Sequence, residues 1–353
     1  MWIEKTKTGL RLVDRIKVNG ITKRVSVPLE KDTPQARKKA TERLLEKTRA
    51  NTQPLSEMRL KEAVEDYLSL KTDCKESTII DLKNNFKNAY LFLGDPKLCE
   101  LNPAMLRRAI YKSEKAKDKP QTVNRCIRVM RTFCAWCVDM EYLPDNPMKN
   151  IRLLKEIKAE KKPSELYLEK DRLQDLLSHL HDIPYYLTRF LALTGCRIGE
   201  ALALTPEDIG SKYITINKSF SEASHQITTP KNSSSIRQVF IQPELRELLN
   251  EYLHWRQINI MAYGIRPKTL FYANTGAIYR ERYYRLLLHP HGVHPHMLRH
   301  THVALLAEQG MSLEAIARRI GHNGTEITRR VYYHVTEKQK EKDESTMASI
   351  RIL

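Results

Sequence analysis

The chain has no long hydrophobic run: no segment approaches the roughly 18 consecutive apolar residues that a membrane-spanning helix needs. Its first residues, MWIEKTKTGLRL, also lack the apolar centre of a secretory signal, so we expect a protein of the cytoplasm. Acidic residues are few relative to basic ones. The 353 residues include 42 Asp and Glu but 60 Lys and Arg, a net charge of +18. Such an excess favours a polyanionic partner, most often nucleic acid.

Cysteine is also too sparse for a disulfide framework, because only six are spread over a chain this long. Cys134 and Cys137 do form a CxxC pair. The pair lies within the helical pattern RVMRTFCAWCVDM, however, and no second pair completes the four ligands of a structural zinc site. We therefore expect both thiols to pack in a core.

Residues 1–50 predict a small sheet followed by one helix. Three segments alternate side chains, and Asn19-Gly20 marks a hairpin turn because both positions accept positive φ. Thr33 and Pro34 suit the N-cap and first position of a helix that runs to about Arg49. Fourteen Lys and Arg against six Asp and Glu favour a DNA-binding module. Its candidate DNA contacts are Arg11, Arg15, Lys17, Lys23 and Arg24.

Residues 57–150 predict an all-helical domain, because apolar side chains recur three and four positions apart. The polar segment 51–56 predicts a linker before it, and the charged segment 151–165 predicts a second linker after it. The last helix of this domain presents three arginines along one stripe, which either follows a phosphate backbone or simply faces solvent. They are Arg125, Arg128 and Arg131.

Residues 166–335 mix helical patterns with alternating, strand-like segments, and the charged segment 336–353 follows as a C-terminal tail. The whole chain is therefore expected to be a multidomain, mainly α protein with small antiparallel sheets, of the α+β class. No internal repeat or low-complexity segment is evident.

Four segments of this last part carry residues suited to one phosphate group. They are TGCRIGEALAL (194–204), TTPKNSSSIRQ (228–238), HPHMLRHTHVALL (294–306) and RRIGHNGTEITRRVYYHV (318–335). Cleavage of a phosphodiester needs positive charge at its non-bridging oxygens, an activated nucleophile and a proton for the leaving oxygen. The candidates for these roles are Arg197, Lys231, His296, Arg299, His322 and Tyr332.

The residue types suggest individual roles. Arginine binds phosphate with two hydrogen bonds and stays charged. The glycines beside Arg197 are expected to let the backbone approach a ligand closely, and Glu200 either holds Arg197 in place or only pairs with it. Lys231 lies in a turn, where a lysine is either a mobile general acid or simply solvated. A tyrosine attacks phosphorus only where cations stabilise its anion, and Tyr333 is the rival of Tyr332.

Histidines crowd the stretch around His296, so a metal site is the alternative there. His296 and His300 have the i,i+4 spacing of a helical zinc pair. No glutamate follows His296 as in an HExxH motif, and no nearby carboxylate completes a ligand set. Arg299 lies in the middle of the cluster, which argues for an anion rather than a cation.

In their order and context, these motifs closely resemble the tyrosine recombinase (phage integrase) family. TGCRIGEALAL, a lysine hairpin, HxLRHTHVALL, IARRIGH and a final Tyr-x-His carry the resemblance. It is especially close to integrases of temperate phages and conjugative transposons of Gram-positive bacteria. The resemblance covers nearly the whole chain, because the first two parts look like that family's arm-binding and core-binding domains.

The resemblance implies site-specific recombination between two DNA duplexes, through a 3′-phosphotyrosyl link and a free 5′-hydroxyl. It implies four protomers on core and arm attachment sites, accessory DNA-bending or excision factors, and no metal, nucleotide or membrane. Arg197 and Arg299 match the family's phosphate-binding arginines, and Lys231 matches the lysine that protonates the leaving group. We hypothesise that the tail, 336–353, docks on a neighbouring protomer and times delivery of the tyrosine.

The same resemblance covers the remaining candidates. His296 and His322 match the two histidines that assist proton transfer and hydrogen-bond the phosphate. The family's nucleophile is usually followed, two residues on, by histidine, so Tyr332-Tyr333-His334 favours Tyr332. A type IB topoisomerase, which only relaxes DNA, and a non-catalytic DNA-binding regulator remain the alternatives. The basic N-terminal module and the two linkers favour the recombinase over the topoisomerase.

Overall fold

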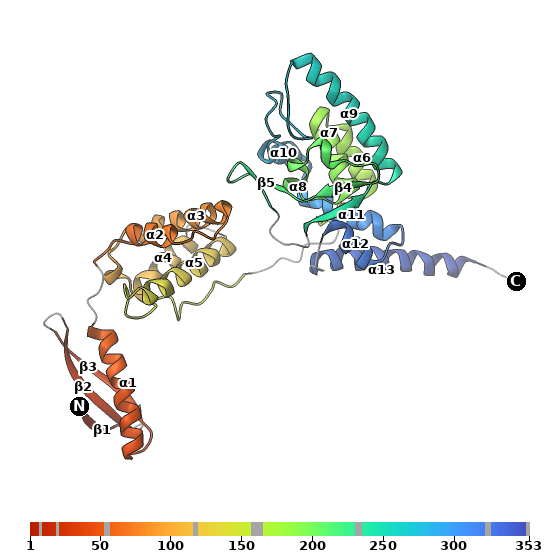
Figure 1. Cartoon of the computed structure of the whole chain (residues 1–353). Helices are drawn as coiled ribbons and strands as arrows, with labels where there is room; N and C mark the ends of the chain where they lie inside the picture. The colour runs from red at the N-terminus through yellow and green to blue at the C-terminus, as the bar shows by residue number, and fades with distance from the viewer. Residues whose placement is uncertain are drawn as a thin grey trace. The chain divides into compact units, whose positions relative to one another are not determined.

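The computed structural model describes the chain except for short segments. Those segments are 7–8, 19–20, 53–56, 116–118, 157–164, 230–234, 322–325 and 351–353. The described residues divide into two units, Met1–Lys158 and Ala159–Leu353 (Figure 1). Helices dominate both units and the sheets are small and antiparallel, so the expected fold class is confirmed. Among the described helices, none is long and apolar enough to cross a membrane.

A three-stranded antiparallel sheet begins the first unit, and one helix covers it. The elements are β1 (Trp2–Thr6), β2 (Gly9–Val18), β3 (Ile21–Leu29) and α1 (Pro34–Thr52). Alternation along β3 buries Val25 and Val27, which pack with Leu44 of α1. The Thr33 hydroxyl accepts a hydrogen bond from the Ala36 amide at 3.3 Å, as an N-cap does. The predicted strands and helix are therefore confirmed.

Helices packed around aromatic rings form the rest of the first unit. They are α2 (Leu60–Ser69), α3 (Glu76–Leu93), the 3-10 helix η1 (Leu98–Glu100), α4 (Pro103–Lys115) and α5 (Pro120–Asp139). Phe86 and Phe133 meet edge to face, with 5.4 Å between ring centroids. Cys134 and Cys137 are buried in the same core, which confirms the expected packing. Burial raises the pKa of Cys134 to about 12.

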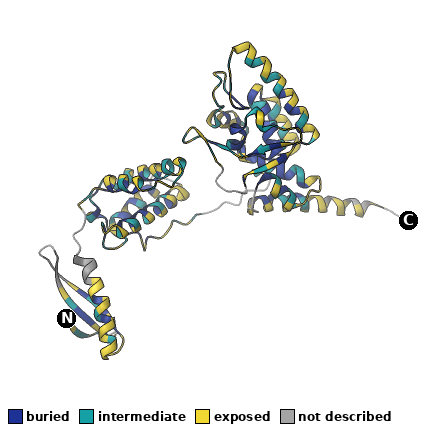
Figure 2. Cartoon of the chain, viewed as in Figure 1, coloured by how far each residue is buried: buried dark blue, intermediate teal, exposed yellow. Residues whose placement is uncertain are grey.

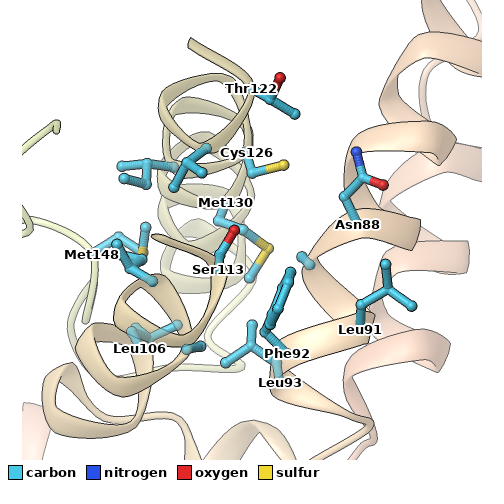
Figure 3. Close-up of a pocket in the computed structure, with 15 residues that line it drawn as sticks. Asn88, Leu91, Phe92, Leu93, Leu106, Ser113, Thr122, Cys126, Met130 and Met148 are labelled. Atoms are coloured by element: carbon cyan, nitrogen blue, oxygen red, sulfur yellow. The ribbon is translucent and has the colours of Figure 1, made fainter. Parts of the chain in front are cut away.

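An apolar pocket of about 200 Å³ opens between α3, α4 and α5. Figure 3 shows Phe92 of α3 and Met130 of α5 pointing toward it. The pocket belongs to the helical part of the first unit and holds none of the catalytic candidates.

The segment after α5 folds back along that helix. The side chain of Asn124 donates to the Leu154 carbonyl at 3.0 Å and accepts from the Leu154 amide at 2.7 Å. Arg131 donates to the carbonyls of Met148 at 3.3 Å and Ile151 at 2.5 Å. Hydrogen bonds thus hold the segment against α5 as far as Leu154. The guanidinium of Arg131 is used in these bonds to backbone carbonyls.

The second unit packs helices around two short sheets. Its helices are α6 (Lys170–Ser178), α7 (Asp182–Thr194), α8 (Ile198–Ala203), η3 (Pro206–Asp208), α9 (Pro243–Tyr263), α10 (Glu281–Leu288), η5 (His289–His291), α11 (Pro295–Glu308), α12 (Leu313–Ile320) and α13 (Glu326–Ser349). Its strands are β4 (Tyr213–Ile216) paired with β7 (Arg237–Phe240), and β5 (Ser219–Ser221) paired with β6 (Gln226–Thr228). Buried side chains of α7, α8, β4, β5 and β7 contribute to the main core (Figure 2).

A smaller core lies where α11, α12 and α13 pack together (Figure 1). Val303, Ile316 and Val331 are fully buried there. Helix α13 runs unbroken to Ser349, so the segment expected as a separate tail continues the helix that carries Tyr332. No glycine or proline interrupts it, and most of its residues after Thr336 are exposed (Figure 2).

Candidate active site

Gly195 ends α7 and brings the two arginine-bearing segments together. Its φ of 64° is left-handed, and a Cβ at this position would lie 2.6 Å from the His302 ring. Its carbonyl accepts a hydrogen bond from Arg299 Nη1 at 2.7 Å. A Cβ on Gly199 would lie equally close to the Phe220 carbonyl. These glycines therefore make room for other parts of the chain, and their expected part in letting a ligand approach stays a prediction.

Arg197 is the N-cap residue of α8, and the carboxylate of Glu200 holds it. Glu200 accepts from Arg197 Nη1 at 2.8 Å and from the Arg197 amide at 3.0 Å. Arg237 Nη2 donates to the same carboxylate at 2.8 Å. Burial would raise the pKa of Glu200, but the hydrogen bonds and charges of Arg237 and Arg197 hold it below its ordinary value. Glu200 thus pairs with the Arg197 side chain and also bonds its backbone amide, as expected if it holds Arg197 in place.

Arg299 is a buried cation whose hydrogen bonds are incomplete. Its side chain is only 3% exposed, and Nη1 uses the Gly195 carbonyl, but Nη2 has no partner among the residues that the structure describes. Burial, and next the positive charge of Arg197, lowers the pKa of Arg299 to about 9. A buried charged donor without a partner is costly unless an anion completes it. Arg299 and Arg197 thus place two neighbouring positive charges and one open donor where an anion would complete them.

His296 lies near the same two arginines. It lies in the first turn of α11, three residues before Arg299, and its side chain reaches the surface. Partial burial, then the charges of Arg299 and, more weakly, Arg197, lower its pKa below the ordinary histidine value. Both effects favour the neutral imidazole, which is the form that can accept a proton. The structure thus brings Arg197, His296 and Arg299 together.

His302, which belongs to the crowded histidine stretch, is a core residue. Its Nδ1 donates to the Ala192 carbonyl at 2.8 Å, and its Nε2 accepts from Arg319 Nε at 3.1 Å. Burial and the Arg319 charge lower its pKa to about 3. Both ring nitrogens of His302 are therefore hydrogen-bonded to other groups of the protein. Within the described ranges, no group of three His, Cys, Asp or Glu side chains could hold a metal ion.

Tyr332 and Tyr333 lie on different faces of α13. Val331 and Val335 are buried, and Tyr332 packs half-buried against the same core. Tyr333 is 55% exposed. No hydrogen bond among the described residues joins the Tyr332 hydroxyl to the arginine pair. Lys231 and His322 lie outside the residues that the structure describes.

The N-terminal sheet presents arginines on the face away from α1. Leu12 packs toward α1, so Arg11 points to the other face by strand alternation. Arg15 follows on that face, directly opposite Arg24 in the strand register, and all three arginines are exposed. The side chains of Lys17 and Lys23 lie outside what the structure describes.

The arginines of α5 are less uniform than the predicted stripe. Arg125 is exposed and forms an ion pair with Asp81. Arg128 is also exposed and lies 4.0 Å from Glu156. Arg131 is half-buried and bonded to backbone carbonyls, so Arg125 and Arg128 are the two of this set that face solvent.

Comparison with known proteins agrees with the geometry. The model of the phage integrase family matches residues 167–339. The chain is similar to the prophage ps2 probable integrase of Lactococcus lactis subsp. lactis, with 30% identity over 96% of this chain and 97% of that protein. Sequence, fold and arginine pair define a tyrosine recombinase. Within that class, the chain belongs to the phage integrase family.

Solved structures of integrases share the fold. The Tn1549 transposon integrase in complex with transposon right end DNA is 17% identical, with a TM-score of 0.62 over 81% of this chain and 99% of that chain. A lambda integrase tetramer bound to a Holliday junction is 14% identical, with a TM-score of 0.61 over 87% of this chain and 89% of that chain. The expected family and fold are therefore confirmed.

Proposed function

We propose that the chain integrates and excises a mobile DNA element by attacking each strand with Tyr332. This proposal rests on one observation: Nη2 of buried Arg299, beside Arg197, has no hydrogen-bond partner among the described residues. Arg237 and Glu200 offset each other's charge, so Arg197 and Arg299 leave two positive charges at the site. Two negative charges develop on a phosphodiester when an oxyanion adds to it, and the arginine pair matches them.

In the proposed reaction, the Tyr332 oxygen bonds to phosphorus while the bond from phosphorus to the 5′ oxygen breaks. The phenolic proton passes to a neutral imidazole, a role that suits His296. Lys231 protonates the departing 5′ oxygen, and His322 hydrogen-bonds the phosphate. The 3′-phosphotyrosyl ester has an energy similar to that of the broken bond, so attack by the 5′-hydroxyl of a partner strand reseals DNA without a nucleotide.

The other parts of the chain are proposed to hold the DNA. Residues 1–50 bind arm sites, 57–150 bind core sites and 166–335 cut. Of the two predicted linkers, 51–56 and 151–165, the second begins only after Leu154, because the chain is hydrogen-bonded to α5 up to that residue. The exposed arginine face of the N-terminal sheet supports the first assignment. Four protomers act together on two sites, with accessory DNA-bending or excision factors, as the relative solved as a tetramer on a Holliday junction suggests.

Covalent capture on a nicked duplex tests the proposal. The duplex is first selected from a random-sequence pool by binding to the full chain. A nick beside the cleavage position then lets the short 5′-hydroxyl fragment leave, so that the protein stays attached to DNA. The unchanged chain and Tyr333→Phe should form the adduct, whereas Tyr332→Phe should bind DNA without forming it.

The other outcomes identify the alternatives. Loss of the adduct in Tyr333→Phe alone would make Tyr333 the nucleophile. Binding by the unchanged chain without any adduct would indicate a non-catalytic regulator. Relaxation of supercoiled DNA without strand transfer between two duplexes would indicate a type IB topoisomerase.

A further inference from the structure

Arg237 is a buried arginine that connects three of the segments in which the catalytic candidates lie. It belongs to β7, and its side chain is 6% exposed. Nη2 donates to Glu200 at 2.8 Å, Nε to the Arg319 carbonyl at 2.9 Å and Nη1 to the Ser235 carbonyl at 3.0 Å. Each nitrogen of this guanidinium therefore has a partner within the protein.

Each partner lies next to a catalytic candidate. Ser235 directly follows the segment that contains Lys231, and Arg319 lies near the end of α12, three residues before His322. Glu200 holds both the guanidinium and the backbone amide of Arg197. One planar side chain thus ties β7, which carries it, to the Glu200 carboxylate and to the backbone at Arg319, two places far from it in the sequence.

Stability alone is a poor explanation for this arginine. A buried ion pair often contributes no more net stability than apolar side chains of similar volume. The Glu200 carboxylate, however, is shared: the oxygen that accepts from Arg237 also accepts from the Arg197 amide. Without Arg237, this carboxylate keeps only Arg197 as an ionic partner and is free to rotate toward it. The Arg197 guanidinium would then move away from its place beside Arg299.

We propose that Arg237 is a positioning residue, which sets through Glu200 where the Arg197 guanidinium meets the scissile phosphate. The inference rests on the proposed function of the arginine pair. Arg237 itself is buried and bonded within the protein, so it acts on the chemical step and not on DNA affinity. Because a misplacement of about 1 Å in a catalytic group can cost about 100-fold in rate, the effect on cleavage should be large.

Three variants of the full chain separate positioning from simple structural loss. Arg237→Met removes the positive charge. Arg237→Lys keeps the charge but replaces the planar guanidinium by an ammonium group. Arg256→Met is the matched control, because Arg256 is another partly buried arginine that donates to backbone carbonyls, those of Pro267 and Thr269, outside the site. Mobility shift measures DNA affinity, and adduct formation on saturating nicked duplex measures the chemical step.

Arg237→Met should bind the duplex like the unchanged chain but form the adduct about 100-fold more slowly. Arg237→Lys should recover part of that loss, and Arg256→Met should react at the unchanged rate. In a double-variant cycle, Glu200→Gln with Arg237→Met should be no slower than Glu200→Gln alone, because Arg237 acts on Arg197 only through the Glu200 carboxylate.

Three results would overturn the proposal. One is a loss of DNA affinity in Arg237→Met as large as its loss of rate. Another is an equal slowing of Arg256→Met, and the third is a double variant whose loss equals the product of the two single losses. If the unchanged chain forms no adduct at all, the proposed function fails instead, and that result is visible before any variant is compared.

Discussion

Replacing Arg299 by methionine should stabilise the folded protein while it abolishes DNA cleavage. Arg299 is a charged side chain in an almost fully buried place, beside the like charge of Arg197 and with one nitrogen unpartnered among the described residues. Such a charge opposes folding until an anion binds. Methionine has a similar length and no charge, so it removes the penalty together with the phosphate contact.

The size of the gain follows from the pKa of Arg299, which burial lowers to about 9. Relative to the ordinary arginine pKa of about 12.5, at about 1.4 kcal/mol per pKa unit, the buried charge costs roughly 5 kcal/mol near pH 7. Methionine gives up the hydrogen bond to the Gly195 carbonyl, which for a charged donor contributes about 1.5–3 kcal/mol. The difference is a gain of roughly 2–3.5 kcal/mol in the free energy of unfolding.

Urea unfolding at pH 7 measures this gain, and Trp255 fluorescence reports on the second unit. Because folding lowers the Arg299 pKa, the penalty is full below about pH 9 and declines as the pH rises above it. The advantage of Arg299→Met should therefore shrink at higher pH, and sulfate should also shrink it by binding the unchanged chain. Arg197→Met is the control and should destabilise, because it removes a partner of buried Glu200. A less stable Arg299→Met would refute the reasoning.

Three further predictions concern the same unit. Gly195→Ala should lose more than about 2 kcal/mol of unfolding free energy, because its backbone is left-handed and a Cβ would overlap the His302 ring. His302, with a folded pKa of about 3, should cost the protein about 1.4 kcal/mol of stability per pH unit below about 6.5, and His302→Asn should flatten that acid slope. Truncation after Thr336 should slow strand exchange between duplexes but spare adduct formation; normal exchange would exclude the proposed docking of the tail.

Local sequence patterns predicted most of the elements that position the site. The N-cap at Thr33, the buried alternation of β3 and the packing of Cys134 and Cys137 follow from short-range rules, and the structure confirms them. The boundary of the tail was harder to predict. Charged residues suggested a separate segment after residue 335, but helix propensity without a glycine or proline continues α13 to Ser349.

Arg237 was missed because the strand pattern around it is ambiguous. In the segment IRQVFIQ, Ile236 and Phe240 lie on one face and Val239 and Ile241 share the other face with Arg237, so alternation does not decide which face is buried. In the structure, Ile236 is 58% exposed and Arg237 is buried beside Glu200. A charged residue on the buried face is predictable only if its partner is known. That partner lies in another segment, 37 residues away in the chain.

Arg237 and Arg299 show that residue type alone does not tell which arginine of such a cluster binds a ligand. Both are buried arginines within one cluster of charges. Arg237 uses each of its nitrogens on the protein, whereas Arg299 keeps one donor without a partner among the described residues. A satisfied guanidinium fixes structure, and an unsatisfied one is completed by an anion. The motifs assigned Arg299 to a phosphate site by resemblance, and its open donor is the physical observation that supports this proposed role.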